Sequence, residues 1–430
     1  MTDSEAPAEP PATAAARAVV DLDHHDPAFH ERRVAEWARL RAECPVAWNQ
    51  HHGGFWMVAG HEEVGIAARD AVTFSSRYEP EPVDGIDYIG IVGVPRPRRV
   101  PKAGIAEVEG PGHLALRRAM NPFMVPKATA VVEPLMRQVA TWFLDERIES
   151  GSMDLVTDFA TPVPSVLTMA LVGLPLDDWR RWADLFHGSL AHDPGGDAAR
   201  QTRDHLPAMF AQIDELIADR RANPRDDLAT ALITMDVDGE ALSDADITAV
   251  LWNLIGGGLD TTASLTSLSL HHLAAQPEQR RRIAEEPELM PLATEEFLRY
   301  FSVNETLSRT VTCPTTLGGQ ALGAGDPLVL SWASANRDAA VFDRADEVVI
   351  DRERNPHLAF GVGPHRCIGM HIARAMFGVM LREIVTRIPD YVVDADGVVF
   401  YRPNPEVVGM VHLPVTFTPG PRVGPSSCPF

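Results

Sequence analysis

One short stretch constrains this chain more than any other. Residues 360–369 read Phe-Gly-Val-Gly-Pro-His-Arg-Cys-Ile-Gly, so glycines crowd the approach to Cys367, and a helical pattern of apolar residues follows at once. We expect the Cys367 thiol at the end of a glycine-rich loop and the start of a helix. Unpaired backbone N–H groups and the positive end of the helix dipole favour a thiolate there. A held thiolate is a good metal ligand, whereas the alternative is an inert buried cysteine before a helix.

Composition excludes several classes of function. The 430 residues carry 38 basic and 60 acidic side chains, a net charge of −22, which argues against nucleic-acid binding because that requires a basic face. The four cysteines are widely spaced, with no CxxC pattern, which indicates a reducing cytoplasm. We expect residues 1–20 to form a disordered tail and not a signal peptide, and residues 421–430 a short C-terminal tail. No apolar run of about 18 residues is evident, so no membrane span is expected.

Hydrophobic periodicity predicts a mainly α chain with small β-sheets (α+β) in one domain over residues 21–420. Helices are expected at 26–44, 61–69, 113–123, 127–149, 155–172, 176–191, 202–222, 226–235, 243–275, 277–286 and 288–300. Strand-like runs are expected at 45–48, 55–58, 310–350 and 391–418. Residues 74–108 show no period and are rich in proline, yet they contain apolar side chains. So long an irregular segment inside a compact protein is usually functional or disordered, and the apolar residues argue against plain disorder.

The helix expected at 243–275 has an unusual centre, Gly-Gly-Gly-Leu-Asp-Thr-Thr over residues 256–262. Each glycine inside a helix costs about 1 kcal/mol relative to Ala, so the run should loosen the helix and leave room beside it. Asp260 and Thr261 then place a carboxylate and a hydroxyl at the gap, groups suited to hold a small molecule and supply protons. The alternative is close helix packing at the glycines, with Thr261 bonding back to its own helix.

Other polar residues carry weaker signals. Glu296 and Arg299 lie three apart on one predicted helix face, a pairing that is usually solvated and weak. The pairs at 51–52 and 271–272 are histidines without a third ligand at useful spacing, so we interpret them as surface or core residues rather than a metal site. Arg96, Arg98 and Arg99 could hold a substrate carboxylate, although a solvated charge cluster is the favoured interpretation.

The cysteine stretch closely resembles the haem-binding signature of the cytochrome P450 family, and the glycine run resembles its oxygen-binding motif Gly-Gly-x-Asp-Thr. The resemblance covers essentially the whole chain after about residue 20, and it implies the single-domain cytochrome P450 fold. It makes Cys367 the axial ligand of the haem iron, where a thiolate favours O–O cleavage. It also makes Asp260 and Thr261 the catalytic pair that protonates dioxygen. Three further residues would form a buried structural network, namely Glu296, Arg299 and Arg352.

The same resemblance assigns contacts with the cofactor. Two pairs of residues match the family's partners of the haem propionates, namely His113 with Arg117 and Arg309 with His365. Taken singly, each would be interpreted as a surface residue. The remaining expected haem contacts are Gly257, Phe360 and Gly369. The chain departs from the family before residue 113, where Glu-Gly-Pro-Gly stands in place of the usual acidic or proline residues.

By resemblance, the chain is a haem-thiolate monooxygenase that uses dioxygen and two electrons to hydroxylate, epoxidise or otherwise oxidise a small organic substrate. The implied cofactor is haem b, and electrons from NAD(P)H would arrive through a ferredoxin and a ferredoxin reductase, docked near Arg118, Arg366 and Arg374. A cytoplasmic monomer acting in bacterial natural-product biosynthesis is expected. Two alternatives stay open: a haem enzyme of oxidative radical coupling, and a catalytically silent relative that activates a partner enzyme. Cys367 argues against the second, because such relatives lose the cysteine.

The resemblance also places a substrate pocket above the haem. It draws on the irregular loop, the oxygen-binding helix, the stretch after the helix expected at 288–300, and the C-terminal strands. The lining would be mostly apolar, as ligand pockets usually are. Its expected residues are Ile86, Tyr88, Ile89, Leu254, Val303, Asn304, Val407 and Val408.

Overall fold

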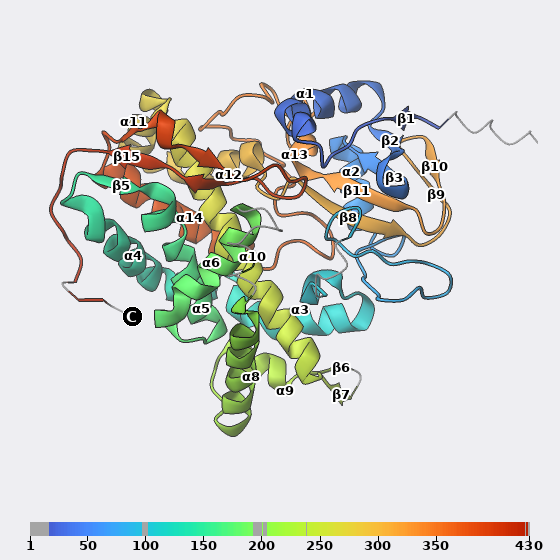
Figure 1. The fold of residues 1–430 in the computed structure, drawn as a ribbon, viewed down its shortest axis with the longest axis horizontal. Helices are drawn as coiled ribbons and strands as arrows, with labels where there is room; N and C mark the ends of the chain where they lie inside the picture. The colour runs from blue at the N-terminus through green and yellow to red at the C-terminus, as the bar shows by residue number, and fades with distance from the viewer. Residues whose placement is uncertain are drawn as a thin grey trace, which may run out of the picture.

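The computed structural model describes residues 17–96, 102–191, 200, 204–237, 239–425 and 427–428. Figure 1 shows helices filling one side of the molecule and the main sheet the other, with the long helix α10 crossing between them. The helices are α1 (Pro27–Glu43), α2 (His61–Arg69), α3 (Gly110–Met124), α4 (Pro126–Ile148), α5 (Pro162–Val172), α6 (Trp179–Ala191), α8 (Leu206–Ala222), α9 (Leu228–Thr234), α10 (Asp244–Ala274), α11 (Pro277–Glu285), α12 (Leu289–Phe301), α13 (Trp332–Ala335) and α14 (Met370–Arg387). The prediction of a mainly α fold with small sheets is confirmed.

The main sheet joins strands from the N-terminal part of the chain with two strands from residues 306–331. Its strand order is β1-β2-β3-β11-β8-β4, and strands β2 and β3 form an antiparallel hairpin in which Trp48 lies opposite Trp56. The strands of this sheet are β1 (Val19–Val20), β2 (Val46–Asn49), β3 (Phe55–Val58), β4 (Phe74–Ser75), β8 (Thr306–Val311) and β11 (Pro327–Ser331). The smaller sheets contain β5 (Ser152–Asp154), β6 (Asp236–Val237), β7 (Glu240–Ala241), β9 (Thr315–Leu317), β10 (Gln320–Leu322), β12 (Val392–Val393), β13 (Val399–Phe400), β14 (Met410–His412) and β15 (Pro414–Thr416).

Helix α10 is the centre of the packing. The Ser243 hydroxyl caps its N-terminus by accepting from the Asp246 N–H at 3.1 Å, which satisfies one of the unpaired donors of the first turn. Every residue from Thr262 to Leu270 is buried, and the helix packs against α5, α6, α12 and α14. A helix that is apolar on nearly all sides must lie inside the protein. Side chains on α10 are therefore placed by the whole helical core.

Two expected elements differ in the structure. The helix expected at 155–172 is divided into a π-helical turn at Leu155–Ala160 and helix α5, because Pro162 has no N–H with which to continue the ladder. Most of the strand expected at 310–350 is absent from the described residues beyond Ser331, where α13 and turns follow. The window Leu155–Val172 is apolar enough to cross a membrane by length and composition, which the sequence analysis overlooked. It is 72% buried inside the protein, as the core helices of globular proteins are.

The ends of the chain are more ordered than expected. Residues 1–16 lie outside the described part of the chain, but Val19 and Val20 already pair with β2 as a parallel strand. At the other end, the Asp145 carboxylate on α4 accepts hydrogen bonds from the N–H groups of Val423 at 2.9 Å and Gly424 at 2.7 Å. The predicted C-terminal tail therefore lies against α4 as far as residue 424.

Candidate active site

The cysteine loop folds back on itself before α14. The Cys367 N–H donates to the Phe360 carbonyl at 2.8 Å, and Gly363 has a φ of +81°. A Cβ at Gly363 would lie 2.5 Å from the Ala68 carbonyl oxygen, so only glycine fits this position. The loop thus presents Cys367 just before the first residue of α14, as predicted.

The Cys367 thiol is open to solvent on one side, yet it lies deep enough in the fold for burial to shift its titration. Burial raises the pKa of this thiol, and the Gly369 N–H and the Arg117 guanidinium only partly offset the rise. The thiolate that we expected from the helix terminus is therefore not favoured by the protein alone. A bound metal ion deprotonates a coordinating thiol, so the site is suited to a ligand role rather than to a free nucleophile.

The three glycines of α10 have different neighbours. A Cβ at Gly256 would lie 2.7 Å from the Phe186 ring, and one at Gly258 would lie 2.5 Å from the Thr168 hydroxyl. A Cβ at Gly257 would meet nothing within 4 Å. Two glycines thus permit close helix packing, and Gly257 alone leaves open space. The helix runs unbroken through all three, so the loosening predicted from glycine content is wrong.

The acid and the alcohol of α10 face different surroundings. The Thr261 hydroxyl donates to the Gly257 carbonyl one turn earlier, at 2.8 Å, so both residues lie on the open face of the helix. Asp260 is buried, and one of its carboxylate oxygens accepts from the Tyr401 hydroxyl at 2.5 Å and lies 3.1 Å from Nδ1 of His187. Its other oxygen accepts from Ser264 at 3.3 Å. Residues 187 and 401 were missed by the sequence analysis, and only Ser264, at i+4 on the same helix, carried a signal.

Two of the predicted haem contacts lie side by side. The rings of His113 and His365 are tilted by 30°, and their centroids are 4.3 Å apart. Within the described residues, Nε2 of His113 and Nδ1 of His365 are buried and have no hydrogen-bond partner. Buried polar atoms are nearly always paired, so these two point to a missing partner. Carboxylates of a bound cofactor would supply it.

Arg309 on β8 adds a buried charge to this group. Its guanidinium donates to the Ser308 carbonyl at 2.6 Å, and no carboxylate in the described part of the chain forms an ion pair with it. Burial lowers the pKa of Arg309 to about 10, and the carboxylates of Glu109 and Glu107 oppose this. An uncompensated buried cation is costly. An anionic cofactor would relieve that cost, so the residues present fit a haem with its propionates.

Glu109 explains where the chain departs from the family pattern. Its carboxylate accepts from the Ser75 hydroxyl at 2.7 Å and the Ser76 N–H at 2.7 Å, and lies 3.8 Å from Nε2 of His365. Ser76 also contacts Nε2 of His365 at 2.9 Å. The residue just before α3 therefore orients the ring of His365. Arg117 lies on α3 and donates to the Arg366 carbonyl at 2.9 Å.

Glu296 and Arg299 are fully buried, and Arg352, whose side chain is 9% exposed, joins them in one network. The Glu296 carboxylate accepts from Nε of Arg299 at 2.9 Å, Nε of Arg352 at 2.9 Å and the Val349 N–H at 2.8 Å. Arg299 also donates to backbone carbonyls of residues 336, 345 and 347 at 2.7–2.8 Å. The carboxylate thus ties α12 to the irregular chain that leads into the cysteine loop. This geometry suits a structural role.

The predicted pocket residues do not form one group. Val407 and Val408 line a cavity of about 640 Å³ between α1, the end of α10 and the C-terminal strands. Val303 and Asn304 are joined to them by the Val408 N–H bond to the Val303 carbonyl at 3.0 Å and by the bridge between Asn304 and Val407. Ile89 instead packs against the hydrophobic cluster around α1.

Three other predicted pocket residues do not line this cavity either. Tyr88 lies under the Arg77 guanidinium at 5.1 Å, and Ile86 pairs with Val83 in a tight turn. Leu254 lies on α10 one turn before Gly258 and packs against the main core. The eight residues therefore divide between the irregular loop, α10, the stretch after α12 and the segment before β14.

The loop of residues 74–108 is held by a buried ion pair. Arg96 pairs with Glu107, with Nη2 of Arg96 3.1 Å from the carboxylate, and Glu107 also accepts from the N–H groups of Ile91 at 2.8 Å and Ala103 at 2.7 Å. The solvated cluster expected around residue 96 is therefore wrong for Arg96, whose side chain is only 7% exposed. The other two arginines of that cluster lie outside the described residues.

A thiol at the end of a glycine-rich loop, an acid–alcohol pair and a buried arginine beside two histidines would suit a haem-thiolate oxygenase, and comparison with known proteins supports that class. A family model described as Cytochrome P450 matches residues 178–388. The chain is 32% identical to linalool 8-monooxygenase of Pseudomonas putida over 387 residues, which cover 85% of this chain and 92% of the relative. It is 30% identical to steroid C26-monooxygenase of Mycobacterium tuberculosis over 410 residues, which cover 94% and 99%.

Solved structures agree with the sequence relatives. Cytochrome P450 CYP268A2 of Mycobacterium marinum, in complex with pseudoionone, superposes with a TM-score of 0.81 at 27% identity, covering 96% of this chain and all of that one. The chain belongs to the cytochrome P450 family. It is an oxidoreductase that incorporates oxygen, with haem iron as the cofactor and electrons supplied from outside the chain.

Proposed function

We propose that this chain holds haem b through Cys367 and uses dioxygen and two electrons to oxidise a small organic substrate by hydroxylation, epoxidation or a related insertion. The observation that carries the proposal is the pair of buried, unpartnered nitrogens on His113 and His365 beside the buried Arg309. These groups need anions, and the two propionates of protoporphyrin IX supply them. The family supports the haem, and the contacts of this chain support the assignment of residues.

When bound, the haem iron supplies the redox chemistry of dioxygen activation. The overall reaction consumes two electrons and two protons, places one oxygen atom in the substrate and releases the other as water. The chain must therefore hold the iron, exclude bulk water and deliver protons. Cys367 would hold the iron through its sulfur, and the Gly369 N–H opposes the rise that burial causes in the pKa of this thiol.

Proton delivery falls to the acid–alcohol pair of α10. Thr261 stands on the open face beside Gly257, where its hydroxyl, on rotating away from the Gly257 carbonyl, can donate to a small bound molecule. Asp260 is buried and reaches His187 and Tyr401 on the other side. Asp260 can therefore receive a proton from the side of His187 and pass it towards Thr261.

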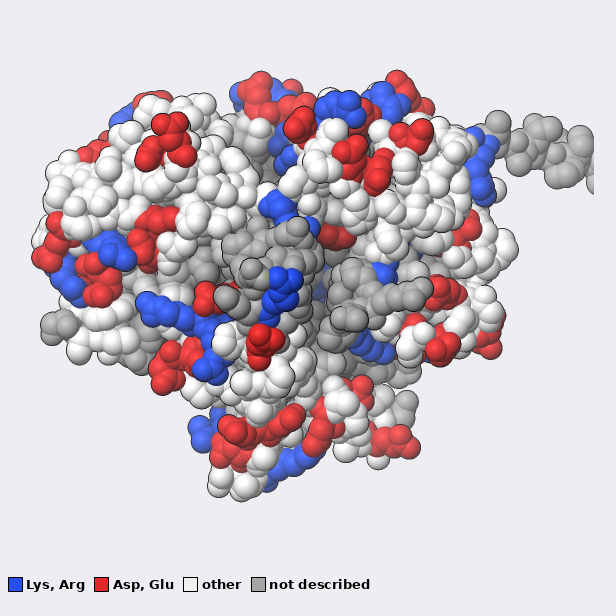
Figure 2. All heavy atoms as spheres, in the orientation of Figure 1, with Lys and Arg blue, Asp and Glu red and all other residues white. Residues whose placement is uncertain are grey.

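Electrons come from separate partners in this proposal, namely NAD(P)H through a ferredoxin and a ferredoxin reductase. Arg118 and Arg366 near the cysteine loop are exposed and can meet an acidic partner. Arg374 is not available, because its guanidinium pairs with Glu295 at 2.6 and 2.7 Å and lies over the Phe360 ring at 4.6 Å. On the face drawn in Figure 2, acidic and basic side chains are interspersed.

The substrate class follows from the relatives and the pocket. The named relatives act on linalool and on steroids, and both are small, largely apolar molecules. Val303, Val407 and Val408 give this chain apolar side chains near the C-terminal strands. We therefore propose a small apolar substrate of bacterial natural-product biosynthesis, oxidised by a cytoplasmic monomer.

The test is the absorption spectrum of the dithionite-reduced protein under carbon monoxide. A strongly red-shifted Soret band is expected in the wild type and in Cys313→Ala, which removes an exposed cysteine elsewhere, and it should be absent from Cys367→Ala. A Cys367→Ala variant with the same band would overturn the ligand assignment. Incorporation of ¹⁸O from ¹⁸O₂ into a product distinguishes oxygen insertion from oxidative coupling, which incorporates none.

A further inference from the structure

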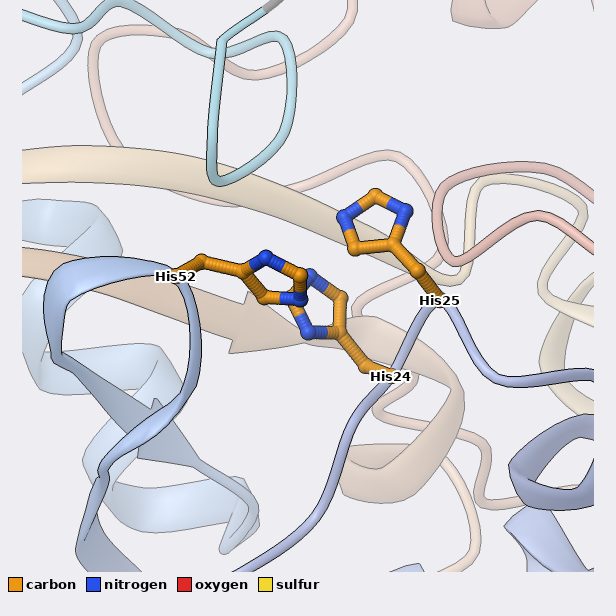
Figure 3. A group of neighbouring side chains, drawn as sticks. All are labelled: His24, His25 and His52. Carbon is orange, nitrogen blue, oxygen red and sulfur yellow. The ribbon is translucent and has the colours of Figure 1, made fainter.

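Three histidines from two segments meet beside the main sheet. His24 and His25 lie just before α1, and His52 lies in the 3-10 turn His51–Gly53 between β2 and β3 (Figure 3). The ring centroids are 4.3 Å apart for His24 and His25, 4.8 Å for His25 and His52, and 5.3 Å for His24 and His52. One ring nitrogen of each lies within 4.8 Å of those of the other two. In the sequence, no further ligand lies at a useful spacing from His52. The fold, however, brings His24 and His25 to it.

The hydrogen bonds of the two outer rings fix which nitrogen is free. Nε2 of His25 lies 3.0 Å from the Val94 carbonyl, and Nε2 of His52 lies 2.8 Å from an Asp23 carboxylate oxygen. Carbonyl and carboxylate oxygens can only accept, so both Nε2 atoms carry the proton. The lone pair of each neutral ring is therefore on Nδ1. This is how metal-binding histidines are commonly held, with one nitrogen on an oxygen acceptor and the other on the metal.

His24 supplies the third nitrogen of the cluster. It also gives independent evidence that a binding partner is missing. Its side chain is 3% exposed and packs edge-on against Phe55. Within the described residues, its Nδ1 is buried and has no hydrogen-bond partner. Buried polar atoms are nearly always paired, and a metal ion would provide the partner that Nδ1 of His24 lacks.

One residue of the cluster has a left-handed backbone conformation. His52 has a φ of +53°, a conformation that costs a non-glycine residue about 1–3 kcal/mol and persists mainly where the surroundings enforce it. Asn49 fixes the facing segment, because its amide donates to the Leu22 carbonyl at 2.6 Å. The neighbouring His51 points elsewhere and pairs with Asp21 at 2.6 Å. The turn therefore singles out His52 for the cluster.

We propose that His24, His25 and His52 bind one divalent transition-metal ion of the zinc class, which clamps the segment before α1 onto the β2–β3 turn. Imidazole nitrogens suit zinc, copper and nickel, and do not suit magnesium or calcium. Zinc–nitrogen bonds of about 2.0–2.1 Å in tetrahedral geometry place ligand nitrogens about 3.4 Å apart. One ring nitrogen of each side chain already lies within 4.8 Å of those of the other two, and side-chain rotation can bring the free nitrogens to the shorter metal-bound spacing. The fourth position takes water.

The clamp also reaches the irregular loop. His25 is bonded to the Val94 carbonyl, and Val94 lies in the segment 74–108 that the sequence analysis singled out. Asp23 holds His52, so Asp23 acts as a positioning residue rather than a ligand. Loss of such a carboxylate partner typically weakens metal binding by about 10–100-fold.

The experiment is zinc titration of the metal-stripped, haem-loaded protein by calorimetry, with bound metal counted by mass spectrometry. We expect about one zinc per chain in the wild type and none in His52→Gln or His25→Gln. The control His51→Gln should bind as the wild type does, and Asp23→Asn should bind about 10–100-fold more weakly. Magnesium at equal concentration should give no heat. The carbon monoxide spectrum of each variant reports that it is folded.

Each outcome decides the proposal. Zinc binding that survives His52→Gln, or that is lost equally in His51→Gln, would place the metal elsewhere and overturn it. Wild-type protein that takes up no zinc would do the same. A His24→Gln variant that loses its haem spectrum would be set aside as misfolded, and the decision would rest on the exposed residues His25 and His52.

Discussion

Tyr401 holds the buried Asp260 carboxylate with a hydrogen bond of 2.5 Å from its phenol oxygen. Burial raises the pKa of Tyr401, and the neighbouring Asp260 raises it further, so the phenol stays protonated and can only donate to the carboxylate. The position of the acid on α10 therefore depends on the C-terminal strands. The contact between Tyr401 and Asp260 therefore holds the acid in place from outside α10.

Replacement of Tyr401 by Phe should release Asp260 without disturbing haem binding. We expect product formed per NAD(P)H consumed to fall about 10-fold, a part of the 10²–10⁴-fold that a positioned proton donor contributes. The measurement compares NAD(P)H consumption with product and hydrogen peroxide. Ser264→Ala is the matched control, because its hydroxyl donates to Asp260 over a longer 3.3 Å and should change coupling little. Fully coupled turnover in Tyr401→Phe would show that the tyrosine is only a packing residue.

The three glycines of α10 should respond differently to alanine. Gly257→Ala adds a Cβ that meets nothing within 4 Å, so it should raise stability by up to about 1 kcal/mol through helix propensity, while the added methyl impairs turnover. Gly258→Ala brings a Cβ to 2.5 Å from Thr168 and should destabilise by about 1–3 kcal/mol. Urea unfolding of the two variants gives the comparison. Equal destabilisation by both would contradict the open space at Gly257.

Arg309→Met should separate cofactor binding from folding. It removes a buried cation that lacks an ionic partner among the described side chains, so the haem-free protein should unfold at the same or higher urea concentration. Haem affinity should fall about 30-fold or more, since truncating one partner of a buried charge pair costs about 2–5 kcal/mol. Arg118→Met, at an exposed position of α3, is the control. Unchanged haem release from Arg309→Met would remove this residue from the cofactor site.

Glu295 should contribute a pH-dependent part of stability. Burial raises its pKa, but hydrogen bonds from His357 and Arg374 outweigh burial and lower it to about 2, from 4.5. Because the folded pKa is depressed, this stabilisation is complete above about pH 4.5 and is lost as the pH falls towards 2. Glu295→Gln should therefore be less stable than the wild type at pH 7, and the difference should shrink by pH 3. Glu278, whose ion pair is exposed, provides the control, because Glu278→Gln should change the free energy of unfolding little at any pH. Urea midpoints at pH 7, 4.5 and 3 test this.

Local patterns were enough to place the parts of the site that lie close together in sequence. The cysteine loop, α14 and the acid–alcohol pair of α10 follow from glycines, a helical period and short spacings. Family resemblance added Arg352, which the structure brings to Glu296 at 2.9 Å. Such features can be recognised in the sequence because each depends on residues that lie close together along the chain.

Contacts between distant segments left no such pattern. Tyr401 and His187 reach Asp260 from 141 and 73 residues away, and neither lies in a motif. Strand β1 is two residues long, too short to show a period, so its residues fall at the end of the predicted tail, and no pattern marks His24 or His25. The effect of each glycine of α10 on packing also depends on its neighbours. Phe186 and Thr168 determine which of these glycines pack closely, and the local sequence does not identify those partners.

The buried carboxylate of Glu107 has a further consequence. It accepts hydrogen bonds from the N–H groups of Ile91 and Ala103 and pairs with Arg96, so it fixes the chain on both sides of residues 97–101. One carboxylate therefore holds three described positions of the loop together. Loss of its charge would release all three at once, so the scaffold that carries Ile89 and Val94 should loosen as one unit rather than turn by turn.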